Sequence, residues 1–486
     1  MNPLLVWLTL GLWILIATGI ALMAKRGMGE GVVEYFIGGR RLGGFISAMT
    51  YSATTYSAFM LVGLVGLTYK TGVGALGFEM TYLIFTVLFL IIFGPRFWFA
   101  GQEYDYVTPP ELLAGRYDTR WAGVVSAVIS LVMLVPYASV QLMGTGFLVE
   151  GLSGGKIPYM AGVLIMAAFS GFSALWAGMR SVSWTDAFQA ITMITTSLIA
   201  IFFLFFHFFG SPLGFFQEIT AAHPDLLKVS WSPKLFIGLA LPWAFFALTN
   251  PQVSQRMFVP DKISNLRRMI VYFAIFGFLY TLISTLFGFQ AAGILPGLEN
   301  PDKAMPTLLT RIPVPLALII FAGIFAAATS TLGSIVLTLS SLVSRDLARN
   351  LNPDIEEKSE LSVGKLSIPL LLGACVIFAW IQPGLIAVLS SMASGGLLVM
   401  APALIGAFFW EGASGPGAVV SMAVGGGLTA AMYLADFYPF GWWPSVWGLL
   451  ITTFLFVTIS LLTEAPQGAG EFLNKVENHL ENYGIS

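Results

Sequence analysis

Thirteen apolar stretches recur along the chain, each about as long as a helix that crosses a bilayer. A transmembrane helix needs about 20 mostly apolar residues, and only 10% of the residues here are charged, against about 25% in soluble proteins. The sequence therefore predicts an all-α integral membrane protein with thirteen transmembrane helices. The predicted spans are 4–24, 46–68, 75–95, 122–148, 159–178, 183–208, 235–255, 267–290, 312–343, 364–382, 385–410, 415–435 and 445–463.

The basic residues divide unequally between the two sides of the membrane. With the N-terminus outside, seventeen of the 23 Lys and Arg residues fall in inner segments, and only six lie outside: Lys70, Lys156, Lys228, Lys234, Lys303 and Arg311. Because basic residues favour the cytoplasmic side, we expect a plasma (inner) membrane protein with its N-terminus outside and its C-terminus in the cytoplasm. The outer segments 209–234 and 291–311 should form short helices, and the tail 464–486 a solvated amphipathic helix.

The composition argues against several classes of function. A net charge of −2 and the lack of a basic tail give no indication of a nucleic-acid partner. Cys375 lies in an apolar stretch and the three histidines are scattered, so neither a disulfide nor a Cys/His metal cluster is expected. The spans hold no nucleophile, base and metal set, so we expect neither an enzyme nor a cofactor. Apart from the lipid bilayer, no obligate protein partner is indicated.

The stretch Phe325–Ser334, FAAATSTLGS, departs from the large apolar residues that fill the rest of the span 312–343. Ser330 and Ser334 share one helix face, and Thr331 is adjacent. Hydroxyl oxygens at membrane depth suit a hard cation such as Na⁺, which prefers oxygen ligands. Small and hydroxyl residues are equally typical of a packing seam between helices, so this stretch alone leaves both interpretations open.

Two spans carry features that favour a broken helix. The span 46–68 contains the mostly polar run 52–57, and the span 235–255 contains Pro242 and then Asn250-Pro251. A proline leaves a carbonyl unpaired and clashes with the preceding turn. Interrupted helices at matching positions of two inverted halves indicate the binding site of a secondary transporter. An ordinary proline kink in the span 235–255 is the alternative.

Two motifs connect the chain to a known family. The run Tyr35-Phe-Ile-Gly-Gly-Arg-Arg-Leu-Gly-Gly and the run Gly178-Met-Arg-Ser-Val-Ser-Trp-Thr-Asp-Ala-Phe-Gln resemble the sodium/solute symporter family. That family includes sodium/proline, sodium/sugar, pantothenate, sialic-acid and monocarboxylate symporters. The similarity extends over nearly the whole chain, with one departure at Ala177, where the family usually has glycine.

The resemblance implies a LeuT-type fold, in which two inverted repeats of five helices form one transporter domain. Its implied parts are the domain 1–463, with a first extra helix 4–24, repeat one 46–208, repeat two 235–410 and two further helices within 415–463, followed by the tail 464–486.

The resemblance also implies a sodium site between the spans 46–68 and 312–343. Its ligands would be three carbonyls and two hydroxyls, from Ala53, Tyr56, Ala327, Ser330 and Thr331. Five neutral oxygens suit a weakly held monovalent ion better than a divalent one.

Asp186 is the most informative single residue in the resemblance. It would lie on the sodium exit path, or form a second sodium site with Ser334, but Gly333 stands where such relatives carry a serine, so we expect one coupling sodium. Ser183 to Asp186 also fits a helix capping box, with Arg180 as a partner for the carboxylate.

The solute candidates lie at mid-membrane depth. Tyr137 and Trp243 match aromatic positions of the proline symporter pocket, Phe59 replaces a tryptophan there, and Thr55 replaces an aspartate, which argues against a proline-like solute. Phe246 matches the aromatic inner gate of sugar symporters.

Two further polar residues are candidates, Gln141 and Glu79. Glu79 is a carboxylate inside the outer half of a span, where an ionisable group indicates function, although an interfacial, solvated position is the alternative that we favour. No Lys or Arg is predicted at the midplane of a span, so small neutral, zwitterionic or monocarboxylate solutes are favoured.

These observations predict a sodium-coupled symporter that imports a small polar solute by alternating access. The solute would be an amino acid such as proline, or a monocarboxylate or pantothenate-like molecule. The alternatives are proton coupling at the same fold, carried by Asp186 or Glu79, and a solute-sensing membrane module, although the tail is too short for a kinase.

Overall fold

The computed structural model describes residues 1–27 and 29–484, which form helices and connecting segments. The first half contains α1 (Pro3–Lys25), α2 (Val32–Ile37), η1 (Gly38–Arg40), α3 (Gly44–Thr55), η2 (Phe59–Leu64), α4 (Val65–Thr71), α5 (Val73–Tyr104), α6 (Pro109–Arg116), α7 (Arg120–Ser153), α8 (Tyr159–Phe209), α9 (Pro212–Ala222) and η3 (Pro224–Leu227). The second half contains α10 (Pro233–Ala244), α11 (Phe246–Thr249), α12 (Pro251–Ser254), η4 (Gln255–Phe258), α13 (Ile263–Ile294), η5 (Pro301–Lys303), α14 (Ala304–Leu309), α15 (Val314–Ser341), η6 (Leu342–Arg349), α16 (Glu357–Ile381), α17 (Ile386–Leu397), η7 (Leu398–Met400), α18 (Ala401–Phe409), α19 (Gly415–Leu434), η8 (Pro439–Gly441), α20 (Pro444–Leu462) and α21 (Ala469–Asn482).

Eleven helices within the described residues are long and apolar enough to cross a membrane. Two of them belong to α8, which is divided at Gly178, where the backbone takes a φ of 60° and a ψ of 177°. The other two predicted spans, 46–68 and 235–255, are each broken into shorter helices. The all-α membrane fold is therefore confirmed, whereas the count of thirteen spans stays a prediction.

Both breaks have a local cause. α3 ends at Thr55, and Tyr56 takes an extended conformation before the π-helix η2 begins. Asn250 is also extended, because the residue before a proline disfavours helical geometry, and α12 starts at Pro251. Pro242 lies within α10 without ending it. The span 235–255 is thus interrupted, and the alternative of a continuous kinked helix is wrong.

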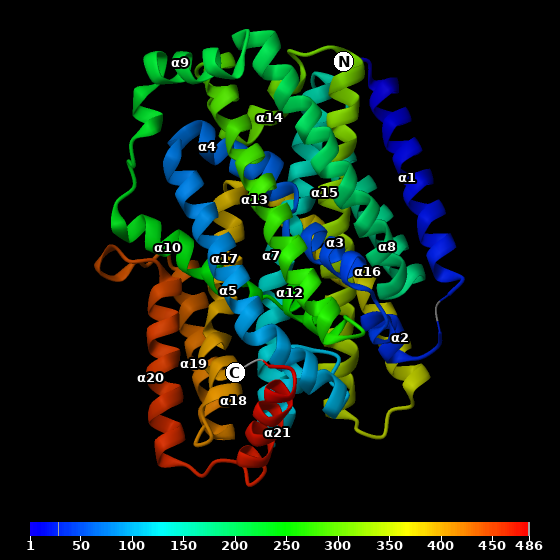
Figure 1. The fold of residues 1–486 in the computed structure, drawn as a ribbon, viewed down its shortest axis with the longest axis vertical. Coiled ribbons are helices and arrows are strands. Elements are labelled where there is room, and N and C mark those ends of the chain that lie inside the picture. The colour runs from blue at the N-terminus through cyan, green and yellow to red at the C-terminus, as the bar shows by residue number, and fades with distance from the viewer. Residues whose placement is uncertain (28, 485–486) are drawn as a thin grey trace.

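The broken helices lie inside the bundle, next to α15. α1 and α20 run along opposite edges of the molecule, while α15 and α7 pass through its middle (Figure 1). In keeping with this, 72% of the apolar window of the α15 span is buried, against 28% for α1 and α20. Other helices of the bundle therefore cover most of α15.

The two ends of the bundle carry short helices, as the sequence predicts. α9 and α14 lie towards the end that holds the N-terminus, and α21 lies at the opposite end (Figure 1). α21 is amphipathic, as predicted, but its apolar face is buried rather than solvated. Its residues Phe472, Val476 and Leu480 are buried, and the ring of Phe472 stacks on Tyr104 of α5 with centroids 5.4 Å apart.

Candidate functional site

The centre of the site is the gap between α3 and η2, where the backbone of the broken helix is exposed to other side chains. Ala58 N donates to Oε1 of Gln141 at 3.0 Å, and Phe59 N donates to the hydroxyl of Ser57 at 3.1 Å. These two bonds satisfy amides that a continuous helix would have paired internally.

Two hydroxyls of α15 reach the last turn of α3. Ser330 Oγ lies within donating distance of two carbonyls, that of Ala53 at 2.8 Å and that of Ala327, three residues earlier on α15, at 3.0 Å. Thr331 Oγ1 donates to the Ala53 carbonyl at 2.9 Å. Four of the five predicted ligand residues therefore lie together, and all four are buried. Tyr56 lies in the break, and its carbonyl accepts no side-chain hydrogen bond from the described residues, so its role as a ligand stays a prediction.

This oxygen group has the chemistry that a sodium ion needs. Each of the two hydroxyls already lies within hydrogen-bond distance of the Ala53 carbonyl. A hydroxyl can turn its lone pairs towards a cation instead of its proton towards a carbonyl. Sodium bound here would therefore replace hydrogen bonds between α3 and α15 with ligand bonds, and hold the two helices together.

Asp186 lies beside this group on α8, buried and surrounded by donors. Thr50 Oγ1 donates to its Oδ2 at 2.6 Å, and Nη2 of Arg256 lies 3.6 Å from the same atom. Ser334 Oγ is 3.5 Å away and makes a 3.0 Å contact with Thr54. Asp186 therefore lies next to the oxygen group, and its place on the sodium exit path stays a prediction.

The predicted capping box at Asp186 is wrong. The helix already begins again at Gly178, so Ser183 lies within it and its buried hydroxyl has no partner among the described residues. The partner of the carboxylate is Arg256 rather than Arg180.

Arg256 is not among the site residues predicted from the sequence, where it counts only as an inner basic residue. Its guanidinium is fully buried and donates to Thr50 at 3.3 Å, to Ser334 and to the Gln252 carbonyl. The one signal available was its position, because it follows closely after the Asn250 break. It links η4 to α3, α8 and α15.

Gly333 leaves open space beside Asp186. A Cβ at this position would meet no atom within 4 Å. A cavity of about 20 Å³, lined by Asp186, Gln189 and Ser330 among others, lies next to it. That volume is about the size of one water molecule.

The predicted solute residues form an aromatic cluster. Trp243 stacks on Phe59 with centroids 4.9 Å apart and on Phe246 at 5.1 Å, and the ring of Tyr137 lies 6.4 Å from Trp243 and 6.0 Å from Phe246. Tyr82, which the sequence analysis missed, lies 5.3 Å from Trp243. The four predicted aromatic residues thus come together from α7, α10, α11 and η2.

Several buried polar atoms near the broken helix have no partner among the described residues. They include Thr55 Oγ1, Gln141 Nε2 and both carboxylate oxygens of Glu79. Glu79 is completely buried, so the interfacial, solvated position that we favour for it is wrong. The role of Thr55 in solute binding stays a prediction. Trp243 is satisfied, because its Nε1 donates to Ser391 of α17 at 2.8 Å.

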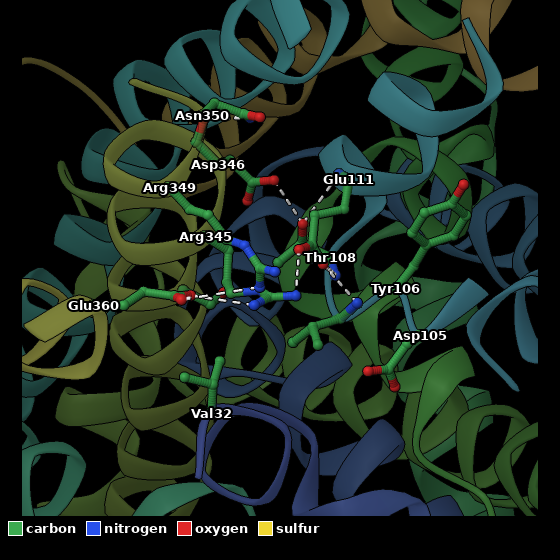
Figure 2. Close-up of polar contacts among 12 residues, drawn as sticks. Val32, Asp105, Tyr106, Thr108, Glu111, Arg345, Asp346, Arg349, Asn350 and Glu360 are labelled. Carbon is green, nitrogen blue, oxygen red and sulfur yellow. Dashed lines mark hydrogen bonds and ion pairs between the residues drawn. The ribbon is translucent and has the colours of Figure 1, made fainter. Parts of the chain in front are cut away.

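Ion pairs join three elements at the end of the molecule that carries α21. Arg345 of η6 lies 2.6 Å from Glu111 of α6 and 3.3 Å from Glu360 of α16, and Thr108 donates to Asp346 at 2.7 Å (Figure 2). Arg345, Glu111 and Glu360 line a cavity of about 680 Å³. This end of the molecule is therefore held by buried charges, although the cavity itself lies open beside them.

A buried carboxylate occupies the opposite end. Oδ2 of Asp302 accepts a hydrogen bond from Ile386 N, the first residue of α17, at 3.0 Å. Burial raises the pKa of Asp302 to about 6, and the Ile386 hydrogen bond opposes this shift. Asp302 therefore ties η5 to the start of α17.

The fold defines a class of protein, the LeuT-type secondary transporters, in which two helices are broken around the binding site. The model of the sodium:solute symporter family matches residues 35–425, and the chain belongs to this family. It is a transporter and not an enzyme, it is a multi-pass membrane protein, and Na⁺ is its coupling ion.

Curated relatives are similar over nearly the full chain. A sodium/pantothenate symporter of Escherichia coli K12 is 29% identical over 473 residues, which cover 94% of this chain and 96% of the relative. A sodium/proline symporter of Staphylococcus aureus is 24% identical over 499 residues, which cover 97% of this chain and 96% of the relative.

Solved structures share the fold. A Na⁺-coupled sialic acid symporter in a substrate-bound outward-open state matches with a TM-score of 0.82 at 19% identity, covering 95% of this chain and 98% of the other. Mhp1, a nucleobase-cation-symport-1 family transporter in a closed conformation, matches with a TM-score of 0.58 at 12% identity, covering 90% of this chain and 98% of the other.

Proposed function

We propose that this symporter binds its coupling sodium between α3 and α15 and carries a small polar organic solute beside it. The sodium ligands would be the carbonyls of Ala53, Tyr56 and Ala327 and the hydroxyls of Ser330 and Thr331. One observation carries the proposal most directly: both hydroxyls converge on the Ala53 carbonyl at the edge of the broken helix.

The solute would bind against the aromatic cluster of Phe59, Tyr137, Trp243 and Phe246. Aromatic walls with a few polar groups are typical of small-molecule sites. The sodium/pantothenate and sodium/proline relatives make pantothenate and proline the first solutes to test, with short monocarboxylates next. Each contains a carboxylate, which suits hydrogen-bond donors such as the Gln141 amide.

Transport would run by alternating access, with the N-terminus outside and the C-terminus in the cytoplasm of a plasma membrane. Sodium would hold the broken helix in a binding-competent shape, the solute would bind, and sodium would leave past Asp186. By linkage, sodium tightens solute binding by the same factor that the solute tightens sodium binding.

A thermal-shift screen of the purified protein tests the solute and the ion together. The protein is heated with pantothenate, proline, short monocarboxylates, sugars or sialic acid, with and without sodium, because a ligand that binds only the folded state raises its stability. The expected result is stabilisation by a carboxylate-containing solute only when sodium is present.

Uptake into proteoliposomes separates sodium from proton coupling. A sodium gradient should drive uptake, whereas a pH gradient in sodium-free buffer should not. Uptake driven by the pH gradient alone would contradict the proposed sodium site and would favour Glu79, whose two oxygens have no partner among the described residues, as a proton carrier.

A further inference from the structure

Helix α7 holds the break of the first broken helix directly. The side chain of Gln141 accepts the Ala58 amide at 3.0 Å, and both residues are fully buried. One turn further along α7, a Cβ at Gly144 would come within 3.0 Å of the Ala58 Cβ. The lack of a side chain at Gly144 therefore lets the break lie against α7, where Gln141 reaches it.

The hydrogen bond fixes which end of the Gln141 amide faces the break. A backbone N–H can only donate, so the atom opposite Ala58 is the amide oxygen. The NH₂ end, Nε2, is then left buried and without an acceptor among the described residues. A buried donor without a partner is unfavourable, and a ligand oxygen placed beside it would remove that cost.

The residue that carries this donor lies on the same helix as one member of the aromatic cluster. Gln141 is one turn from Tyr137 on α7, so the two share a face of the helix. The ring of Tyr137 contacts Trp243 and Phe246 at centroid distances of 6.4 and 6.0 Å. The free amide therefore belongs to the wall on which we place the solute.

Two backbone amides at the start of the helix after the break are already hydrogen-bonded, so they are not available to a solute anion. The start of a helix often binds a carboxylate through its free amides. Here the Ala58 amide is taken by Gln141 and the Phe59 amide by the Ser57 hydroxyl. A solute oxygen at this place therefore meets the Gln141 side chain in place of those two backbone amides.

We infer that Gln141 is a positioning residue that joins the solute to the sodium site. Its oxygen accepts the Ala58 amide and holds the break that presents the Ala53 and Tyr56 carbonyls. Its NH₂ group donates a hydrogen bond to an oxygen of the solute, from a carboxylate or an amide carbonyl. This inference rests on the proposed sodium and solute sites. One side chain would contact both sites and so couple sodium binding to solute binding.

Two substitutions test the accepting oxygen and the donating NH₂ group of Gln141 separately. Gln141→Glu keeps an acceptor for Ala58 but removes the donor, whereas Gln141→Met has a similar length and removes both. The KM for solute, tested with pantothenate and with proline, is measured in proteoliposomes. The sodium midpoint without solute is measured by thermal shift on the purified protein.

Gln141→Glu should raise the solute KM at least tenfold and leave the sodium midpoint within twofold of wild type. Gln141→Met should raise both at least tenfold. Gln290→Met is the matched control, because Gln290 is a buried glutamine that bonds the Ile201 carbonyl away from the site, and it should move neither constant.

A result in which Gln141→Met leaves both constants within twofold of wild type would overturn the inference. So would a rise of the sodium midpoint in Gln141→Glu equal to that in Gln141→Met. Thr331→Ala distinguishes this failure from failure of the proposed function. If Thr331→Ala weakens sodium binding while the Gln141 variants do not, the result supports the proposed sodium site and contradicts the inferred role of Gln141.

Discussion

Asp186 and Arg256 face each other in the interior, with Oδ2 and Nη2 3.6 Å apart and both side chains almost completely inaccessible. Thr50 and Ser334 hydrogen-bond to both members of the pair. The carboxylate nearest the proposed sodium ligands is therefore accompanied by a fixed positive charge. On the proposed exit path, a sodium ion would therefore meet a neutral pair at Asp186 rather than an isolated anion, which favours release over tight binding.

Removing one member of this pair should be more damaging than removing both. Arg256→Met alone should destabilise the protein by about 3–5 kcal/mol, because it leaves a buried carboxylate without its counter-charge. The double variant Asp186→Leu with Arg256→Met should recover much of that stability but not sodium-driven uptake. Thermal unfolding and uptake measure the two effects.

Asp225→Asn is the control for this comparison, since the Asp225 carboxylate is 90% exposed and pairs only with Lys228 on the surface. It should change neither stability nor uptake. Equal stability losses in the Arg256 single and the double variant would contradict a role for charge pairing.

Substitution of the α15 hydroxyls should weaken sodium binding specifically. Ser330→Ala or Thr331→Ala removes one ligand, and we expect the sodium concentration for half-maximal uptake to rise about tenfold, or about 1.4 kcal/mol. Ser126→Ala removes a buried hydroxyl that bonds only carbonyls of its own helix, and it should leave the sodium dependence unchanged. Wild-type sodium dependence in both α15 variants would rule out the proposed ligands.

The stoichiometry should be one sodium per solute. Gly333 provides no hydroxyl beside Asp186, and the Arg256 guanidinium already lies 3.6 Å from that carboxylate. Gly333→Ser adds a hydroxyl in open space but leaves the Arg256 charge in place, so the ratio of sodium to solute should remain one. Reversal-potential measurements in proteoliposomes determine it.

Gly333→Ser should also fold normally, because nothing lies within 4 Å of its Cβ position, whereas a Cβ at Gly323 would overlap the Thr196 side chain. Gly323→Ser should therefore lower the Tm, while Gly333→Ser should not.

A ratio of two sodium ions per solute in the wild type would contradict the proposal of a single sodium site.

The Asp302 contact should make stability depend on pH. Its pKa rises from 3.8 to about 6 on burial, so the protonated form is favoured in the folded state. The resulting stability is fully present below about pH 4 and is lost as the pH rises through about 6. The difference between the two pKa values corresponds to at most about 3 kcal/mol.

Asp302→Asn mimics the neutral carboxyl at every pH. The Tm of the wild type should fall between about pH 4 and 6 relative to that of Asp302→Asn, and the two curves should run parallel above about pH 7. Parallel curves across the whole range would show that Asp302 does not titrate in this window.

Features that depend on neighbouring residues were predictable from the sequence. The polar run before Ser57 and the Asn250-Pro251 pair act on their own backbone, so both helix breaks follow from local chemistry. The hydroxyls of Ser330 and Thr331 were identified for a similar reason, since polar groups in an apolar span are conspicuous. The aromatic cluster needed the family resemblance, because aromatic residues in apolar helices usually only pack.

Features that depend on distant pairing were not predictable. The Asp186 carboxylate bonds Thr50 and pairs with Arg256, which lie on two other helices, and nothing near Asp186 in sequence indicates either partner. The capping box failed because the helix starts earlier, at a glycine with positive φ. Glu79 was misplaced because hydropathy gives its depth only approximately and cannot show which neighbours cover it.

The helix that carries Ser330 continues without a gap into η6, so that Val314–Arg349 forms one element of 36 residues. At 1.5 Å per residue it is about 54 Å long, well beyond the roughly 30 Å of a bilayer core. The distance along it from the proposed sodium ligands to Arg345 is about 22 Å. One continuous helix therefore joins the proposed sodium ligands near its middle to the Arg345 ion pairs near its C-terminal end, four residues before Arg349.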